Sequence, residues 1–226
     1  MPEQPPQPLW VSVENYIDAL LIPPDEALDQ ARRDSAAAGL PDIAVTPSQG
    51  RMLWLLARLQ KAQRILELGT LGGYSTIWMA RALPEDGCLV SIEADPKHCE
   101  IARANITRAG FAPQVDLRLG RALDILPELA AEGLEAFDFF FIDADKENAA
   151  DYFRWAVRLG RPGALIVIDN VVRDGEVANP DAPDPRVQGI RRLNEAMAAE
   201  RRVTATTIQT VGSKGYDGFT LALLAG

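Results

Sequence analysis

Oxygen-bearing side chains that could hold a hard cation follow two apolar stretches in the second half of this chain. Asp143 follows the run 139–142, and Asp169 and Asn170 follow the run 166–168. Ligands of an open parallel sheet bind beyond the carboxyl ends of the strands, so the three side chains should converge. Neighbouring carboxylates repel unless a cation separates them, and an all-oxygen set favours Mg²⁺ over Mn²⁺ or Ca²⁺. We predict a metal site here; the alternative is that either aspartate only caps a helix.

Lys146 lies three residues after Asp143. A nearby dication disfavours the ammonium form of a lysine, which suits a general base. This interpretation depends on Asp143 being a metal ligand, since a lysine is otherwise most often an ordinary surface residue.

A glycine turn, Gly69-x-x-Gly72-Gly73, joins an apolar strand to a helix. Its spacing differs from the Gly-x-Gly-x-x-Gly of a dinucleotide pyrophosphate loop. Glu67, just before the turn, would repel a pyrophosphate but suits a ligand with an ammonium group, such as the methionine half of S-adenosylmethionine. Glu93 lies about 20 positions after the turn, where an acidic residue accepts hydrogen bonds from ribose hydroxyls. Backbone groups around Ala122 could border the adenine, or could simply begin a helix.

The elements that must position these residues alternate along the chain. Short apolar strands are predicted at 64–68, 88–93, 115–119, 137–142 and 164–168, separated by helices at 75–83, 96–109, 122–131 and 148–159. This alternation predicts an α/β fold with a doubly wound parallel sheet covered on both faces. At the end, a helix at 191–201 precedes strands at 203–209 and 219–224, and the turn-rich link 211–218 suggests that these strands pair antiparallel.

The first part of the chain differs in character. Residues 1–8 are rich in Pro and Gln and are expected to be disordered. Helices are predicted at 11–21, 25–39 and 47–59. We expect a single domain over 1–226, with an N-terminal helical arm or lid over 1–45 and a catalytic core over 46–226.

Composition and charge exclude several function classes. The net charge is −9, which argues against nucleic acid or anionic membrane partners. The chain shows no secretory leader and no run long enough for a membrane helix, so a cytoplasmic location is expected. Cys88 and Cys99 are expected to be free, and His98, the only histidine, is expected on a surface helix. Zinc sites and histidine-based triads are therefore disfavoured.

With these residues assembled, the chain resembles the cation-dependent O-methyltransferases, the group that includes the catechol and caffeoyl-CoA enzymes. The resemblance covers about 45–226 and rests on the motifs at 67–75, 92–93, 142–146, 169–170 and 214–218. It implies a class I methyltransferase, Rossmann-like fold whose seven-stranded sheet has the order 3-2-1-4-5-7-6. It also implies a homodimer, and a catechol-like aromatic hydroxyl acceptor that receives a methyl group and leaves S-adenosylhomocysteine.

The resemblance assigns roles to individual residues. Asp143, Asp169 and Asn170 would be metal ligands and Lys146 the catalytic base. The cofactor would contact Val45, Glu67, Gly69, Thr70, Ser75, Glu93, Ala122, Asp143 and Asp145. The sequence departs from the pattern at Ala149, where relatives often have an aromatic residue.

The acceptor is the least determined part of the prediction. The arm 9–44 and the loop 171–188 are expected to wall its pocket, with Trp10, Tyr16 and Arg173 as candidates that are more often structural. Other small-molecule hydroxyls, or a non-catalytic cofactor-binding protein, are the alternatives. An NAD-dependent dehydrogenase is disfavoured by the glycine spacing, and an RNA or protein methyltransferase by the acidic charge.

Overall fold

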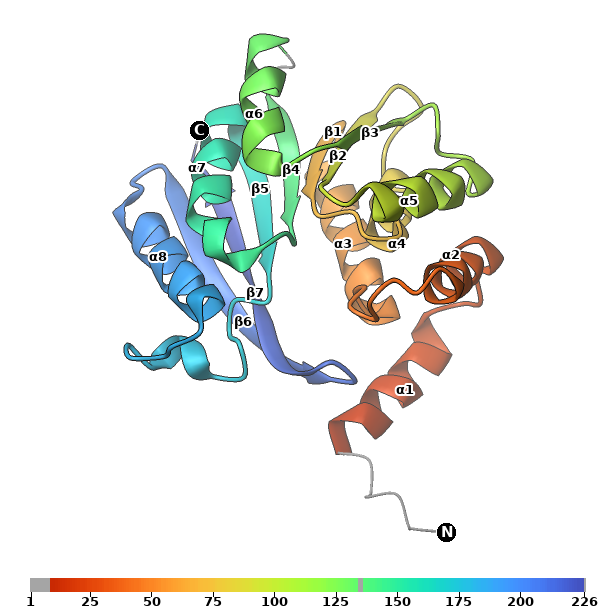
Figure 1. Ribbon diagram of the computed structural model, residues 1–226, viewed down its shortest axis with the longest axis horizontal. Coiled ribbons are helices and arrows are strands. Elements are labelled where there is room, and N and C mark those ends of the chain that lie inside the picture. Colours follow the sequence, from red (N-terminus) through yellow and green to blue (C-terminus); the bar gives the residue numbers. More distant parts are fainter. Residues whose placement is uncertain (1–8, 134–135, 226) are drawn as a thin grey trace.

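The computed structural model describes residues 9–133 and 136–225, which form one twisted sheet with helices on both sides (Figure 1). The seven strands lie in the order β3-β2-β1-β4-β5-β7-β6. They are β1 (Arg64–Leu68), β2 (Cys88–Glu93), β3 (Val115–Leu119), β4 (Phe137–Ile142), β5 (Gly160–Asp169), β6 (Val203–Gly212) and β7 (Gly215–Leu224). β1 to β5 run parallel, and β7 pairs antiparallel with both β5 and β6. The predicted fold class and strand order are confirmed.

Some of the helices begin where the sequence supplies a capping side chain. They are α1 (Leu9–Leu21), α2 (Glu26–Ala37), α3 (Pro47–Gln60), α4 (Tyr74–Ala80), α5 (Pro96–Arg108), α6 (Ala122–Ala131), α7 (Ala149–Leu159) and α8 (Pro185–Ala199), with 3₁₀ turns η1 (Lys146–Asn148) and η2 (Glu176–Ala178). Thr46 and Gln49 form a capping box at α3, and Asp95 caps α5. In both α3 and α5 a proline occupies the first helical position. Its φ is already suited to a helix, and it has no backbone N–H that would lack a partner there.

Alternation along the central strands divides the core into two layers. On β4, Phe140 and Ile142 pack with α6, α7 and α8, whereas Phe139 and Phe141 pack with α3, α4 and α5. Successive side chains of a strand point to opposite faces, so the unbroken apolar run 139–142 of β4 is suited to a sheet covered on both sides. Because helices cover both faces, the free edge for ligands is at the strand ends.

Two predicted boundaries near the end of the chain are wrong. α8 begins at Pro185 rather than near 191, because Asp184 caps it through the backbone N–H of Arg186. The link 211–218, expected as a loop, is mostly paired: Val211 lies opposite Tyr216, and only residues 213–214 turn. Its glycines sit within a long hairpin instead of marking a loop.

The N-terminal arm consists of α1 and α2, and Figure 1 shows α1 extending away from the sheet. α2 packs on the core through Leu28 and Ala31. No helix of residues 9–133 and 136–225 is long and apolar enough to cross a bilayer. Cys88 and Cys99 are free, as expected, and the predicted disorder of residues 1–8 lies outside the described residues.

Candidate functional site

A cavity of about 990 Å³ opens at the carboxyl ends of the parallel strands and is walled by α2 and the loops after β1, β2, β4 and β5. Most of the predicted site residues line it, namely Val45, Gly69, Thr70, Ser75, Glu93, Ala122, Asp143, Asp145, Lys146 and Asn170. Glu67 and Asp169 are not among the lining residues; both are buried at strand ends beside it. The structure therefore brings the predicted residues to one place, with Glu67 and Asp169 buried next to the cavity and not in its lining.

The glycine turn after β1 lies directly against the loop after β4. Gly69 has a φ of +92°, and its N–H donates to Ile92 O at 3.0 Å. A Cβ added at Gly69 would come within 2.4 Å of the carbonyl oxygen of Asp143. Both the left-handed backbone and the contact require glycine, so the turn and the Asp143 loop have a fixed relative position.

Glu67 is enclosed by hydroxyl groups. Its carboxylate accepts hydrogen bonds from Ser75 Oγ at 2.5 Å, Thr76 Oγ1 at 2.5 Å and Ser91 Oγ at 2.6 Å. Complete burial raises its pKa to about 7, and the three hydroxyls partly oppose that rise. The carboxylate thus ties the start of α4 to β1 and β2, an arrangement that the charge argument from sequence did not include.

The raised pKa predicts a pH-dependent stability. Folded Glu67 holds its proton up to about pH 7, but the unfolded side chain loses it near 4.5. The free energy of unfolding should therefore fall by about 3 kcal/mol as pH rises through this window. Glu67→Gln does not titrate, so it should gain stability relative to the parent between pH 5 and pH 8. Urea unfolding of both proteins at the two pH values measures this gain, and parallel pH curves would contradict it.

Glu93, at the end of β2, is tied to the same turn. One carboxylate oxygen accepts from the N–H groups of Thr70 at 3.1 Å and Leu71 at 2.8 Å, and the other from Asp95 N at 2.9 Å. His98 lies at the start of α5 with its Nδ1 3.7 Å from Glu93 and lines the cavity, so it is less peripheral than expected. Glu93 both shapes the turn and faces the cavity.

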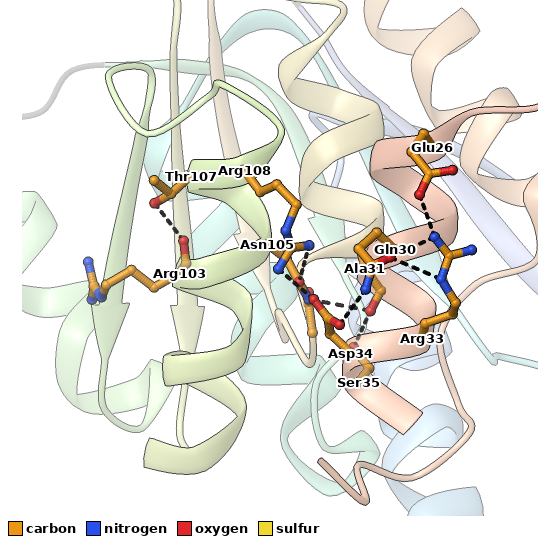
Figure 2. A network of polar contacts seen from close by, with 11 residues as sticks. Glu26, Gln30, Ala31, Arg33, Asp34, Ser35, Arg103, Asn105, Thr107 and Arg108 are labelled. Atoms are coloured by element: carbon orange, nitrogen blue, oxygen red, sulfur yellow. Dashed lines mark hydrogen bonds and ion pairs between the residues drawn. The ribbon is translucent and has the colours of Figure 1, made fainter. Parts of the chain in front are cut away.

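Helix α2 is fixed over the turn by a polar network with α5 (Figure 2). Asn105 is buried and donates to Gly72 O at 2.9 Å and Ala31 O at 3.4 Å, and its side-chain oxygen accepts from Arg108 at 3.0 Å. Arg108 also pairs with Asp34 on α2 at 2.5 Å. Sequence reasoning missed Asn105; its only signal was a polar residue at a position that the helical pattern would bury.

The chemistry end of the cavity carries three charged groups. Lys146 is nearly buried, and its Nζ donates to Asp143 Oδ1 at 2.7 Å. Burial and the negative charge of Asp143 raise the pKa of Asp169 to about 7. Asn170 has a φ of +56°, which turns the chain after β5, and it lines the cavity. The described residues contain no cluster of three Asp, Glu, His or Cys side chains suited to a metal, and here the third oxygen donor would be an amide.

Asp145 has two partners that sequence reasoning missed. Tyr152 on α7 donates to one of its oxygens, and Asn148 Nδ2 donates to the other at 2.5 Å. Burial and the Asp145 charge raise the pKa of the tyrosine, so Tyr152 stays a hydrogen-bond donor. The sequence did contain a signal for these contacts. Asn148 and Tyr152 lie three and seven residues after Asp145, spacings that place side chains on one face of a helix that starts just after Asp145.

The three candidates for the acceptor wall lie in different places. Arg173 lines the cavity, as does the end of the arm. Trp10 and Tyr16 are absent from its lining and lie exposed on α1. α1 points away from the cavity instead of folding over it, so these two aromatic residues do not contribute to its wall (Figure 1).

Comparison with known proteins places this site in a family. The sequence profile of a family described as O-methyltransferase matches residues 22–224. The chain belongs to the O-methyltransferase family. It is 54% identical to the catechol O-methyltransferase of Niastella koreensis, over 96% of this chain and 98% of the relative. It is 48% identical to that of Mycobacterium tuberculosis, over 99% of both chains.

Solved structures agree with the family assignment. An O-methyltransferase from Bacillus cereus in complex with SAH superposes with a TM-score of 0.94 at 54% identity, covering 95% of this chain and 98% of its own. TomG from Streptomyces achromogenes, involved in tomaymycin synthesis and solved with SAM, superposes at 0.93 with 54% identity, covering 96% and 97%. An O-methyltransferase fold thus covers nearly the whole chain, and α1 precedes the segment matched by the profile.

Proposed function

We propose that this O-methyltransferase transfers the methyl group of S-adenosylmethionine to a hydroxyl of a small aromatic acceptor with two vicinal hydroxyls, assisted by a divalent cation. The observation that carries the proposal is one cavity that joins the glycine turn to Asp143, Lys146 and Asn170. Relatives solved with SAH or SAM and relatives named catechol O-methyltransferase support the two ligand classes.

We assign the donor to the end of the cavity at the glycine turn. Glu93 faces that end and would accept hydrogen bonds from the ribose hydroxyls, while its turn contacts keep it in place. Glu67 positions Ser75 and the start of α4, where free backbone N–H groups would meet the donor carboxylate. Val45, Ala122 and Asp145 border the same space.

The residues at the other end fit a divalent cation. Asp169 is buried beside a second carboxylate, so its anionic form is destabilised in the absence of a positive charge. Asp143, Asp169 and Asn170 provide only oxygen, the donor that Mg²⁺ prefers. A cation held by these three residues would lower the pKa of an acceptor hydroxyl.

Lys146 has the position of the proton acceptor in this mechanism. Its Nζ is bonded to Asp143, so the ammonium is held at the edge of the proposed metal site. Lys146 would first release its proton to solvent, because a dication at the neighbouring oxygens would disfavour the ammonium form. The neutral amine would then accept the proton of the acceptor hydroxyl, and Asp143 would hold the ammonium that forms. The cavity walls keep the acceptor oxygen and the donor methyl close together, which supplies much of the rate acceleration.

A labelled-methyl assay tests the proposal. Purified protein with methyl-labelled S-adenosylmethionine should label catechol acceptors in the presence of Mg²⁺. Chelation of the cation by EDTA should lower the rate of transfer by at least about 100-fold. Resorcinol, whose hydroxyls are not vicinal, is the matched acceptor. Undiminished transfer in EDTA would reject the proposed metal dependence. Equal transfer to catechol and resorcinol would reject the proposed requirement for vicinal hydroxyls. The tomaymycin enzyme among the solved relatives makes another small-molecule hydroxyl the alternative.

We also propose a homodimer in the cytoplasm. α1 carries no buried residue within this chain, and it exposes Leu9, Trp10, Tyr16, Leu20 and Leu21. Such a contiguous apolar surface is typical of a protein interface. Mass measurement by light scattering would distinguish the dimer from a monomer; the location stays a prediction.

A further inference from the structure

Arg173 is held in the cavity wall without a hydrogen-bonding partner for its guanidinium. Its side chain is 23% exposed, its Nη1 forms a long ion pair with Oδ2 of Asp217 at 4.0 Å, and Asp184 lies within electrostatic range. The Nε atom is fully buried and unpaired, and the side chain makes no hydrogen bond to any residue of 9–133 or 136–225. Buried donors in proteins are nearly always paired, so the chain leaves this guanidinium under-satisfied. Nε is closed to solvent, and the exposed part of the side chain lines the cavity, where a ligand could reach it.

The second arginine at this end of the cavity shows the contrast. Arg186 donates to both oxygens of Asp184, at 2.7 Å to 3.1 Å, and is exposed. Its charge is therefore already neutralised in a bidentate pair. Among the described residues Arg173 makes no such bidentate pair: its ion pair with Asp217 is 4.0 Å long, so no hydrogen bond neutralises its guanidinium.

Backbone contacts hold Asp217 through one carboxylate oxygen, while its other oxygen, Oδ2, faces Arg173 from 4.0 Å. Oδ1 of Asp217 accepts from the N–H groups of Val172 at 2.9 Å, Arg173 at 3.0 Å and Gly218 at 2.9 Å. Asp217 thus fixes the loop after β5, in which Arg173 has a φ of +56°. The loop holds the arginine in place through its main chain and leaves its guanidinium available.

Charge contacts locate Arg173 at the acceptor end of the cavity. Asp217 is close enough to Asp169 to act on it electrostatically, and it is also the carboxylate nearest to Arg173. The donor end, around Glu93 and the glycine turn, belongs to β1 and β2 on the other side of β4. A ligand group that reaches Arg173 would therefore belong to the acceptor.

We propose that Arg173 binds a carboxylate on the acceptor, so that the preferred substrates are aromatic acids with vicinal hydroxyls. This inference rests on the function proposed above. A guanidinium fork matches the two oxygens of a carboxylate and gives strong charge-assisted hydrogen bonds. The chain has a net charge of −9, which repels an anionic acceptor, so a local cation is needed to hold one.

The test compares two acceptors of similar size, 3,4-dihydroxybenzoate and 4-methylcatechol. For the parent, Arg173→Gln, Arg173→Lys and Arg186→Gln, kcat/KM is measured for both, and Kd for both in the presence of SAH and Mg²⁺. Arg173→Gln should reduce the acid-to-neutral ratio of kcat/KM by at least about tenfold, the range of a charge-assisted pair. Arg173→Lys should retain part of the ratio, and Arg186→Gln should keep it within about twofold.

Equal losses for the two acceptors, or a ratio that does not change, would overturn the inference. A weaker Kd for SAH in Arg173→Gln would also overturn it, because the arginine would then serve the donor. If the parent methylates neither acceptor, the proposed function fails, and the Kd ratio alone then decides the inference. Preferential binding of the acid that depends on Arg173 supports it, and equal binding rejects it.

Discussion

Replacing Lys146 by methionine should lower kcat for methyl transfer by about 10² to 10⁴, the contribution of a positioned general base. Methionine keeps the length and apolar contacts of the side chain but cannot accept a proton. The hydrogen bond to Asp143 is lost as well. KM for the acceptor should change much less than kcat, because the proposed role is in the chemical step.

The acidity of the acceptor distinguishes a base from a purely structural lysine. A nitro-substituted catechol ionises near neutral pH and needs no base, so Lys146→Met should lose far less activity with it than with catechol. Lys97→Met, an exposed lysine on α5, is the control and should retain both activities. An equal loss with the two acceptors would show that Lys146 acts on structure and not on the proton.

Gly69→Ala should unfold more easily than the parent by about 3 kcal/mol or more, and it should lose affinity for SAH. A left-handed backbone costs a non-glycine residue about 1–2 kcal/mol. The added Cβ also lies 2.4 Å from the Asp143 carbonyl, a backbone atom that cannot move aside cheaply. Displacing it would shift the loop that carries Asp143 and Lys146, so methyl transfer should fall with stability.

Gly110→Ala separates the two causes. Gly110 has a φ of +85°, close to that of Gly69, but an added Cβ would meet nothing within 4 Å. Its loss of stability in urea unfolding should therefore reflect the backbone alone. The difference between the two variants measures the contact between the turn and the Asp143 loop. If both variants were equally stable, that contact would carry no energy.

The sheet could be predicted because its strands are short apolar runs that end in functional residues. β4 illustrates this: its run 139–142 is apolar at every position and is buried on both faces, so Asp143, the residue after it, marks the carboxyl end. The predicted residues reach one cavity for that topological reason. The antiparallel pairing of β6 and β7 was predicted, but the start of α8 and the length of the hairpin were not. An aspartate such as Asp184 can cap a helix or lie in a loop, and the glycines at 212 and 215 fit a loop as well as a tight hairpin.

Long-range partners could not be predicted from spacing. Asn105 meets Gly72 and Ala31 only because α2 packs on α5, and the sequence separates these residues by 33 and 74 positions. Glu67 was expected to face the ligand, but hydroxyls from α4 and β2 surround it. Charge indicates that a buried carboxylate needs partners, and only the fold decides whether they come from the ligand or from the chain.

The contact between Gly69 and the Asp143 carbonyl limits how this enzyme could diversify. Any side chain at position 69 disturbs the glycine turn and the Asp143 loop together, so a single substitution there cannot change one of them independently. Arg173, by contrast, projects from a loop whose shape depends on main-chain contacts to Asp217. Directed evolution of substrate range should therefore accumulate changes on the acceptor wall while the glycine turn and Asp143 loop are inherited as one unit.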